Sequence, residues 1–304
     1  MVKNIHDRLK GCLVLGAVGD ALGSYHESKS MHRPFSFDHI SGITDDTQLT
    51  LATCESIFEQ QKVSPSDIAQ SFLKWYNQHR LVGLGSSTLK ALRDLQVGAH
   101  WALSGRTGEY AAGNGAAMRI APLAFFLDVP NQRTMIRDVC FITHKNDEAY
   151  VGALSILYAI HSIICGSWRE GADLISLITS EIPDTLVRDN LLKLQENSSL
   201  TITKAAKLIG CSGHVAESVP LAIFSSQKIR ETDPQKIIGE LINCGGDTDT
   251  NASMAGHIMG SYLGYSNIPE EIGSLFNRIE EKDYILDLSE KLSGIAPIQR
   301  GAKP

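Results

Sequence analysis

Residues 8–23 read RLKGCLVLGAVGDALG, and the pattern of this stretch points to a fold of packed helices. Its apolar residues recur with helical spacing, which predicts a helix over residues 8–22. Gly16, Gly19 and Gly23 lie three and four residues apart, on or near one face of that helix. A glycine inside a helix costs about 1 kcal/mol relative to alanine. Three of them on one face indicate that a second helix approaches closely there, as in proteins built of packed helices.

Helical periodicity dominates the rest of the chain, whereas the alternating pattern of a half-buried strand rarely persists. We therefore expect an all-α fold: one compact multi-helix domain over residues 1–304, with long functional loops near residues 24–46, 97–118 and 243–250. Further helices are predicted at residues 48–60, 65–78, 87–96, 131–142, 147–165, 183–195, 202–208, 214–225, 233–243, 250–263 and 269–292.

The composition excludes several classes of protein. Of 304 residues, 43% are hydrophobic and 20% charged, which is neither disordered nor collagen-like. A net charge of −6 gives no general basic surface for nucleic acid. The six cysteines are scattered without a C-x-x-C pair, which is typical of reduced thiols. Residues 1–11 lack the apolar core of a secretory signal, and no apolar run is long enough to span a bilayer. We expect a cytoplasmic protein without a membrane partner.

Two acidic clusters open predicted helices. The first is Thr44-Asp45-Asp46-Thr47, and the second is Gly245-Gly246-Asp247-Thr248-Asp249-Thr250. Threonine and aspartate are good helix N-caps, and acids favour that end of a helix, so capping is one interpretation of each cluster. Capping accounts for one acid at a helix start better than for two acids flanked by hydroxyl groups.

The two clusters together favour a metal site. Four aspartates with flanking hydroxyls make an all-oxygen set suited to Mg²⁺, Mn²⁺ or Ca²⁺. Without metal their mutual repulsion would raise pKa values, and two divalent cations would offset the four charges. An EF-hand is excluded because Ala252 replaces the required glycine and Ile258 the bidentate glutamate. Cys and His residues show no zinc-ligand spacing.

Six stretches in order along the chain resemble the signatures of the ADP-ribosylglycohydrolases, the dinitrogenase-reductase-activating glycohydrolase-like family. They cover most of residues 8–264. The T-D-D-T and G-G-D-T-D-T pair is the specific part of the resemblance. The stretches are GAVGDALGSYHE (16–27), ITDDTQLTL (43–51), GLGSSTLKALRDLQVG (83–98), GNGAAMRIAPLA (113–124), THKNDEA (143–149) and GGDTDTNASMAGHIMG (245–260).

The resemblance implies an all-α fold with a two-metal centre, usually magnesium or manganese, that hydrolyses the bond between ADP-ribose C1″ and an acceptor. It assigns one half of the metal site to Thr44, Asp45 and Asp46, and the other half to Asp247, Asp249 and Thr250. Glu27 matches an acidic position near the metals in some members. The alternative for Glu27 is a solvent-facing residue at a helix end.

The chemistry follows from these residues. Two nearby cations can hold the ribose hydroxyls and polarise a water molecule, and carboxylates stabilise the oxocarbenium-like transition state. Asp45 or Asp249 is the leading choice to orient or deprotonate that water, and the sequence does not decide between them.

The anionic pyrophosphate of ADP-ribose needs donors of its own. Gly113-Asn114-Gly115, just before Met118, is expected to present backbone N–H groups to it, and the alternative is a plain glycine turn. Ala111-Ala112 stand where family members often carry a polar or aromatic residue. His144 matches a family position near the substrate, and a helix-cap histidine is the alternative.

The leading hypothesis is therefore an ADP-ribosyl hydrolase that acts on ADP-ribose bound to a protein or a small molecule, with two divalent cations, most readily Mg²⁺. A rival from another class is a non-enzymatic member that binds ADP-ribose, or that blocks a toxin or partner by docking. Retention of all four aspartates favours the enzyme, because a binder needs no activated water. A third hypothesis is a hydrolase of another glycosidic or phosphate substrate.

Overall fold

Helices α1 (Ile5–Glu27) and α13 (Thr248–Leu263) pack backbone against backbone in the computed structural model, which describes residues 4–27 and 36–296. A Cβ atom placed at Gly19 would overlap the carbonyl group of Ala252, and one placed at Gly256 would overlap that of Leu15. A Cβ atom at Gly11 would lie 2.5 Å from the carbonyl oxygen of Gly260. The expectation that glycines of the first helix admit a second helix is confirmed.

Fifteen α-helices lie within the described residues, with five short 3₁₀ helices and two short strands. The remaining α-helices are α2 (Asp45–Gln60), α3 (Pro65–Asn77), α4 (Ser86–Gln96), α5 (Trp101–Ser104), α6 (Arg133–Phe141), α7 (Asp147–Ile164), α8 (Leu174–Thr179), α9 (Leu186–Glu196), α10 (Ile202–Ile209), α11 (Val215–Ser226), α12 (Pro234–Asn243), α14 (Glu270–Phe276) and α15 (Lys282–Ser293). The 3₁₀ helices are η1 (Glu109–Ala111), η2 (Asn114–Ala116), η3 (Ala121–Phe125), η4 (Gln227–Arg230) and η5 (Tyr265–Asn267).

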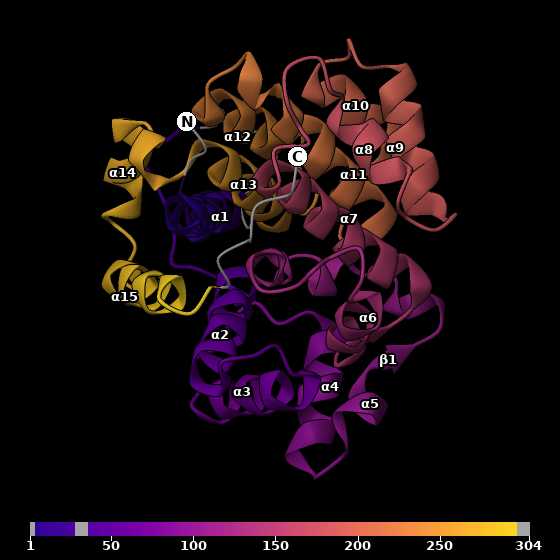
Figure 1. Ribbon diagram of the computed structural model, residues 1–304, viewed down its shortest axis with the longest axis vertical. Coiled ribbons are helices and arrows are strands. Elements are labelled where there is room, and N and C mark those ends of the chain that lie inside the picture. The colour runs from indigo at the N-terminus through magenta and orange to yellow at the C-terminus, as the bar shows by residue number, and fades with distance from the viewer. Residues whose placement is uncertain (1–3, 28–35, 297–304) are drawn as a thin grey trace.

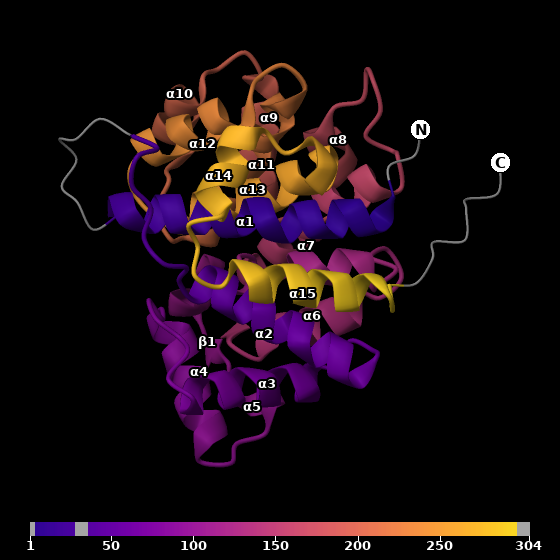
Figure 2. The same cartoon turned by 90° about the vertical axis from the view of Figure 1, so that its left-hand side faces the viewer.

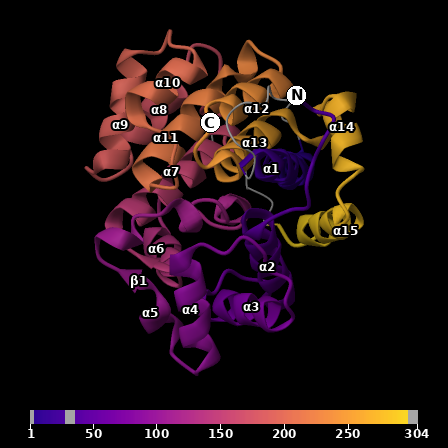
Figure 3. The ribbon, with the colours of Figure 1, turned by 180° about the vertical axis from the view of Figure 1, so that it is seen from behind.

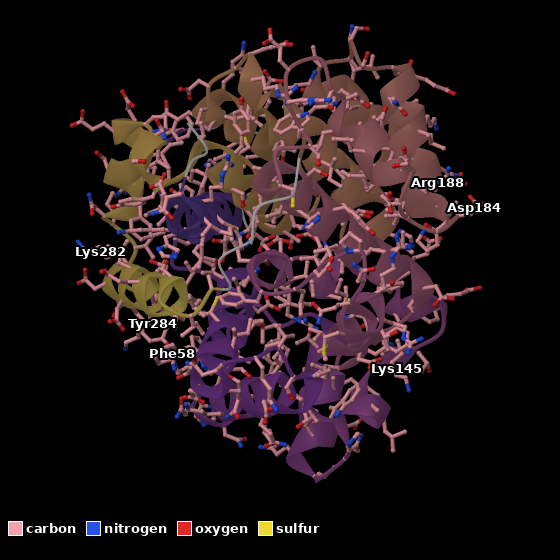
Figure 4. The ribbon with its side chains drawn as sticks, in the orientation of Figure 1. Phe58, Lys145, Asp184, Arg188, Lys282 and Tyr284 are labelled. Atoms are coloured by element: carbon pink, nitrogen blue, oxygen red, sulfur yellow. The ribbon has the colours of Figure 1, made fainter. Side chains whose placement is uncertain are left out.

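Helix α1 crosses the middle of the molecule. Helices α8 to α14 lie on one side of it and α2 to α6 on the other (Figures 1 and 2), and the view from behind shows the same division (Figure 3). Helix α15 runs beside α1 and also packs against α2, where Lys291 Nζ lies 5.9 Å from the centre of the Phe58 ring, which is labelled in Figure 4. Buried apolar side chains form one cluster from Leu9 to Leu292. This continuous core supports our proposal that the chain is a single domain.

Two short strands of two residues each are the β-structure within the described residues. Strand β1 (Arg106–Thr107) pairs in parallel with β2 (His144–Lys145), so that Arg106 lies opposite His144. Strand β1 falls inside the loop that the sequence predicted near residues 97–118, which also contains α5, whereas β2 lies between α6 and α7. Within the described residues no helix is both long enough and apolar enough to cross a membrane.

One predicted helix is wrong. Residues 269–292 form not one helix but two, α14 and α15, separated by turns at residues 277–281. Each short helix buries its own apolar stripe, α14 against α1 and α15 against both α1 and α2. Because both stripes have the same helical period, the sequence pattern does not reveal the turn between them. Of the loop predicted near residues 24–46, residues 28–35 lie outside the described part.

The α1–α13 contact yields a stability prediction. We expect Gly19→Ala to lower the free energy of unfolding by about 3 kcal/mol, because the added methyl group meets rigid backbone rather than a side chain that can move.

Gly273→Ala in α14 is the matched control, since nothing lies within 4 Å of its added Cβ. It should be neutral or stabilising by about 0.5–1 kcal/mol, as expected for alanine in an open helix position. Urea unfolding of both variants measures the difference, and equal stabilities would contradict the close packing.

Candidate active site

The N-termini of α2 and α13 meet, which brings the two acidic clusters together. The Thr250 hydroxyl of α13 donates to Asp46 Oδ2 of α2 at 3.2 Å. Carboxylate oxygens of Asp20, Asp46 and Asp249 all lie within 4.8 Å of one another, and so do those of Glu27, Asp247 and Asp249. Asp249 belongs to both groups and therefore joins them into one acidic site.

Helix capping explains only part of this arrangement. Thr44 is the N-cap of α2, where its side chain accepts from the Asp46 backbone N–H at 3.4 Å. Asp247 occupies the N-cap position of α13, but its side chain makes no capping hydrogen bond. Instead, Asp247 Oδ2 accepts from the side-chain amide of Asn114 at 2.7 Å. Helix capping therefore accounts for the side chain of Thr44 but not for the carboxylate of Asp247.

Asp20 belongs to the site and is absent from the residues that the sequence singled out. It is fully buried on α1, and its two oxygens accept four hydrogen bonds, from the backbone N–H and hydroxyl groups of Thr44 and Thr47. Because these donors already occupy both oxygens, Asp20 fastens the start of α2 to α1 rather than offering a free ligand. A lone aspartate within the apolar run 11–23 was the signal available in the sequence.

Burial and mutual repulsion raise the pKa values of the acidic site. Burial, followed by the interaction with Asp247, raises the pKa of Asp249 to about 9. Burial and the neighbouring Asp20 raise the pKa of Asp45 to about 7. The pKa of Asp46 is well above its usual value, again through burial first and Asp249 second. Glu27 is exposed at the end of α1, and its pKa is raised by partial desolvation and by Asp247.

One buried oxygen of this site has no donor. Asp46 Oδ1 is shielded from solvent and accepts no hydrogen bond from any described residue. A buried carboxylate oxygen left in this way is costly unless a cation or a proton meets it. The candidate metal ligands around it are carboxylate and hydroxyl oxygens, which are the ligands that hard divalent cations prefer. The residues present therefore fit a cation site.

The loop at residues 113–115 is joined to the acidic site. Asn114 bonds Asp247 through its side chain, while its backbone N–H donates to the carbonyl of Gly213 at 3.1 Å. That N–H group is therefore not available to a ligand, contrary to the expectation for the whole loop. The backbone N–H of Gly113 has no acceptor among the described residues. The loop is thus held in place by the segment around Gly213, which the sequence analysis did not single out.

His144 faces the same loop, whereas Met118 does not. A Cβ atom at Gly115 would lie 2.8 Å from His144 Cε1, and one at Gly113 would lie 3.3 Å from His144 Nε2. His144 is 3% exposed and lies in strand β2. It does not cap a helix, because the N-cap of α7 is Asn146. The Met118 side chain is buried in the apolar cluster.

A second glycine loop also borders the site, and it opens the stretch GLGSSTLKALRDLQVG (83–98) that resembles a family signature. Gly83 has a φ of +87°, and a Cβ atom there would lie 3.1 Å from Asp45 Oδ1. The backbone N–H of Asp45 donates to the carbonyl of Val82 at 2.8 Å. A side chain at residue 83 would therefore crowd the Asp45 carboxylate.

Comparison with known proteins gives a consistent result. A model of the ADP-ribosylglycohydrolase family matches residues 1–300. Human ADP-ribosylhydrolase ARH3 is 25% identical, over 91% of this chain and 91% of that one. ADP-ribosylarginine hydrolase Tri1 of Serratia proteamaculans is 28% identical, over 96% of this chain and 80% of that one. A solved structure described as an ADP-ribosylglycohydrolase-related protein complex has a TM-score of 0.69 at 23% identity, covering 97% of this chain and 99% of that one. The likeness confirms the predicted all-α fold.

The raised pKa values predict how pH affects the stability of the chelator-treated protein. Asp249 has a pKa of about 9 when folded and an ordinary value of 3.8, so between these values the folded state binds more protons than the unfolded state. Stability should therefore fall as pH rises from about 4 to 9, with Asp45 contributing the part below about pH 7.

Melting temperatures across this range measure the effect. Saturating Mg²⁺ should remove most of the slope by offsetting the charges. A chelator-treated protein that becomes more stable as pH rises would contradict the description of these carboxylates as mutually repelling.

Proposed function

Because the chain belongs to the ADP-ribosylglycohydrolase family and is a hydrolase, we propose that it is a metal-dependent ADP-ribosyl hydrolase. The reaction would cleave the C1″ glycosidic bond between ADP-ribose and an acceptor. One observation supports the proposed dependence on metal. The acidic N-termini of two helices converge around Asp46 Oδ1, a buried oxygen that accepts no hydrogen bond from the described residues. Membership of a hydrolase family confirms the enzyme prediction over the purely binding alternative.

The proposed cofactor is a pair of divalent cations, Mg²⁺ first and Mn²⁺ second. Thr44, Asp45 and Asp46 would supply one half of this metal site, and Asp247, Asp249 and Thr250 would supply the other half. Bound there, such cations would supply orientation of the ribose hydroxyls and polarisation of the attacking water. Asp20 is not included, because its oxygens are already satisfied by Thr44 and Thr47.

The proposed ligand is ADP-ribose, free or attached to a protein. Gly113 and Gly115 border the site, and the absence of side chains there allows the His144 ring to approach the loop closely. The Gly113 N–H and His144 would bind the pyrophosphate, opposite the carboxylates that repel it. Asn114 would act indirectly, because its side-chain amide donates to Asp247 Oδ2 at 2.7 Å and so holds that carboxylate in place. Met118 supports the loop from the core, with its backbone N–H donating to the carbonyl of Asn114 at 3.0 Å.

The proposed catalytic groups are Asp45, Asp249 and Glu27. Asp45 or Asp249 would orient the attacking water and accept its proton. Glu27 lies at the exposed rim, yet an oxygen of its carboxylate is within 4.8 Å of Asp247 and Asp249. It is therefore placed to face a substrate entering from solvent and to stabilise positive charge on the ribose.

Location and partners are also proposals. A cytoplasmic location is supported by scattered cysteines, of which Cys12, Cys54 and Cys140 are buried thiols. The net charge of −6 disfavours a nucleic-acid partner.

The decisive experiment incubates the protein and Mg²⁺ with ADP-ribose linked to arginine, serine, an acetyl ester or a nucleic-acid base. Release of ADP-ribose from at least one of them supports the proposal, and the released acceptor identifies the substrate. No release from any of the four would contradict it.

We expect Asp45→Asn and Asp249→Asn each to abolish turnover in a folded protein. Each change removes a negative oxygen but nearly preserves volume, so packing should suffer little. Loss of water activation should slow the reaction about a thousandfold or more. Single-turnover release of ADP-ribose at saturating Mg²⁺ measures this.

Asp184→Asn is the control, because that carboxylate is 88% exposed and pairs only with Arg188 on the surface. It should react at the wild-type rate. The metal-free Asp249→Asn protein should melt at a higher temperature than metal-free wild type, since repulsion is relieved. Near-normal rates in both site variants would show that these aspartates do not support catalysis.

Gly115→Val should weaken ADP-ribose binding much more than Mg²⁺ binding. The added Cβ meets the His144 ring at 2.8 Å, while the residue makes no contact with the acidic clusters that would hold metal. Calorimetric titrations of ADP-ribose and of Mg²⁺ separate the two effects, with Gly273→Ala as the control. Equal ADP-ribose affinity in wild type and Gly115→Val would exclude this loop from the ligand site.

A further inference from the structure

Arg119 is a fully buried guanidinium that the proposed reaction does not use. It follows η2 closely in the chain, is 0% exposed and lies 4.8 Å from the centre of the Phe72 ring. Its Nη2 donates to the Thr143 hydroxyl at 2.6 Å and more weakly to the Val139 carbonyl at 3.5 Å. Burial lowers its pKa to about 10, so it remains charged at neutral pH. A buried charge without a carboxylate partner is expensive, which calls for a reason.

The Thr143 hydroxyl passes this interaction to His144. Its oxygen lies 2.6 Å from Arg119 Nη2, which can only donate, and 2.8 Å from His144 Nδ1. No other described residue accepts a hydrogen bond from this buried hydroxyl. If His144 Nδ1 carried a proton, the hydroxyl would receive two donors and its own proton would have no acceptor. The pairing is complete only when the hydroxyl donates to an unprotonated Nδ1.

We propose that Arg119 and Thr143 are positioning residues that fix neutral His144 as the tautomer with its proton on Nε2. That nitrogen lies beside the loop at Gly113 and Gly115, and no described residue accepts a hydrogen bond from it. Phosphate oxygens can only accept hydrogen bonds, so this tautomer matches a pyrophosphate and the other does not. The ligand assignment rests on the proposed function, whereas the tautomer follows from the buried network itself.

The surroundings keep His144 neutral. Burial, followed by the nearby charges of Arg119 and Arg106, lowers its pKa to about 3. The pairing of β2 with β1 holds the backbone of His144 opposite Arg106, while burial and the contact with the Thr143 hydroxyl hold the ring against the loop. His144 is therefore a neutral hydrogen-bond donor whose tautomer is set by the guanidinium of Arg119, a fully buried side chain outside the proposed ligand site.

The test is a long-range ¹H–¹⁵N spectrum of the full-length protein labelled at histidine, with Mg²⁺ present. The chain has ten histidines, and His144→Gln identifies the signal of His144. We expect the Nε2-protonated tautomer alone in the wild type without ADP-ribose. Protonation at Nδ1 of the wild-type protein would overturn the proposal.

Thr143→Val and Thr143→Ser form a matched pair. The valine variant loses the hydroxyl, so both tautomers should become detectable and the dissociation constant for ADP-ribose should rise about fivefold. The serine variant should restore the single tautomer and the wild-type affinity. An unchanged tautomer in a folded Thr143→Val protein would overturn the relay. Failure of wild type to bind ADP-ribose would overturn the ligand assignment and the proposed function, while the spectrum would still judge the relay.

Discussion

The close approach of α1 and α13 is the constraint on which the rest of the structure depends. At the carboxyl-terminal end of α1, a Cβ atom at Gly23 would overlap the backbone of Asp249. The Thr248 hydroxyl donates to the Gly23 carbonyl at 2.9 Å, which fixes the two helices in register. As a result, the last turn of α1 delivers Glu27 to the first turn of α13. A wider spacing between the helices would move Glu27 away from Asp247 and Asp249.

The site that this contact creates works against the stability of the fold. Several carboxylates are brought together in a region shielded from water, and their raised pKa values record the unfavourable free energy of keeping them charged there. Asp20 differs from them in that Thr44 and Thr47 supply it with four hydrogen-bond donors, although burial still raises its pKa. The contrast separates two roles: Asp20 is satisfied and holds the start of α2, whereas Asp46 has a buried oxygen without a donor among the described residues, which would suit the proposed cation.

How much of this could be predicted from the sequence depended on whether a signal was local. Helix positions and the glycine face of α1 follow from spacing within one segment, so they were predicted well. The turn between α14 and α15 was missed because it is decided by which neighbours the two helices pack against. Asp20 was missed for a related reason: its partners Thr44 and Thr47 are 24 and 27 residues away, and only the fold brings them to it.

The candidate site shows the same limit. The two acidic clusters were predicted to converge because their shared chemistry makes sense only together, and Thr250 indeed reaches Asp46. The use of the loop donors was not predictable, because the backbone N–H of Asn114 is taken by Gly213, far away in sequence. Motif spacing reports which residue types a site has. It does not report which of their hydrogen-bonding groups the fold has already used.

The bond between Asn114 and Asp247 makes the loop and the acidic site one unit. At 2.7 Å the amide donates to an oxygen of a carboxylate that also belongs to the proposed metal set. Charge on Asp247 therefore strengthens the bond that holds the loop, and a cation drawing on the same carboxylate changes it. If a ligand binds only when the loop is in one position, its affinity depends on the charge of Asp247. Coupling of this kind is reciprocal, so a ligand seated at Gly113 and Gly115 must in turn alter the affinity of the acidic site for its cations.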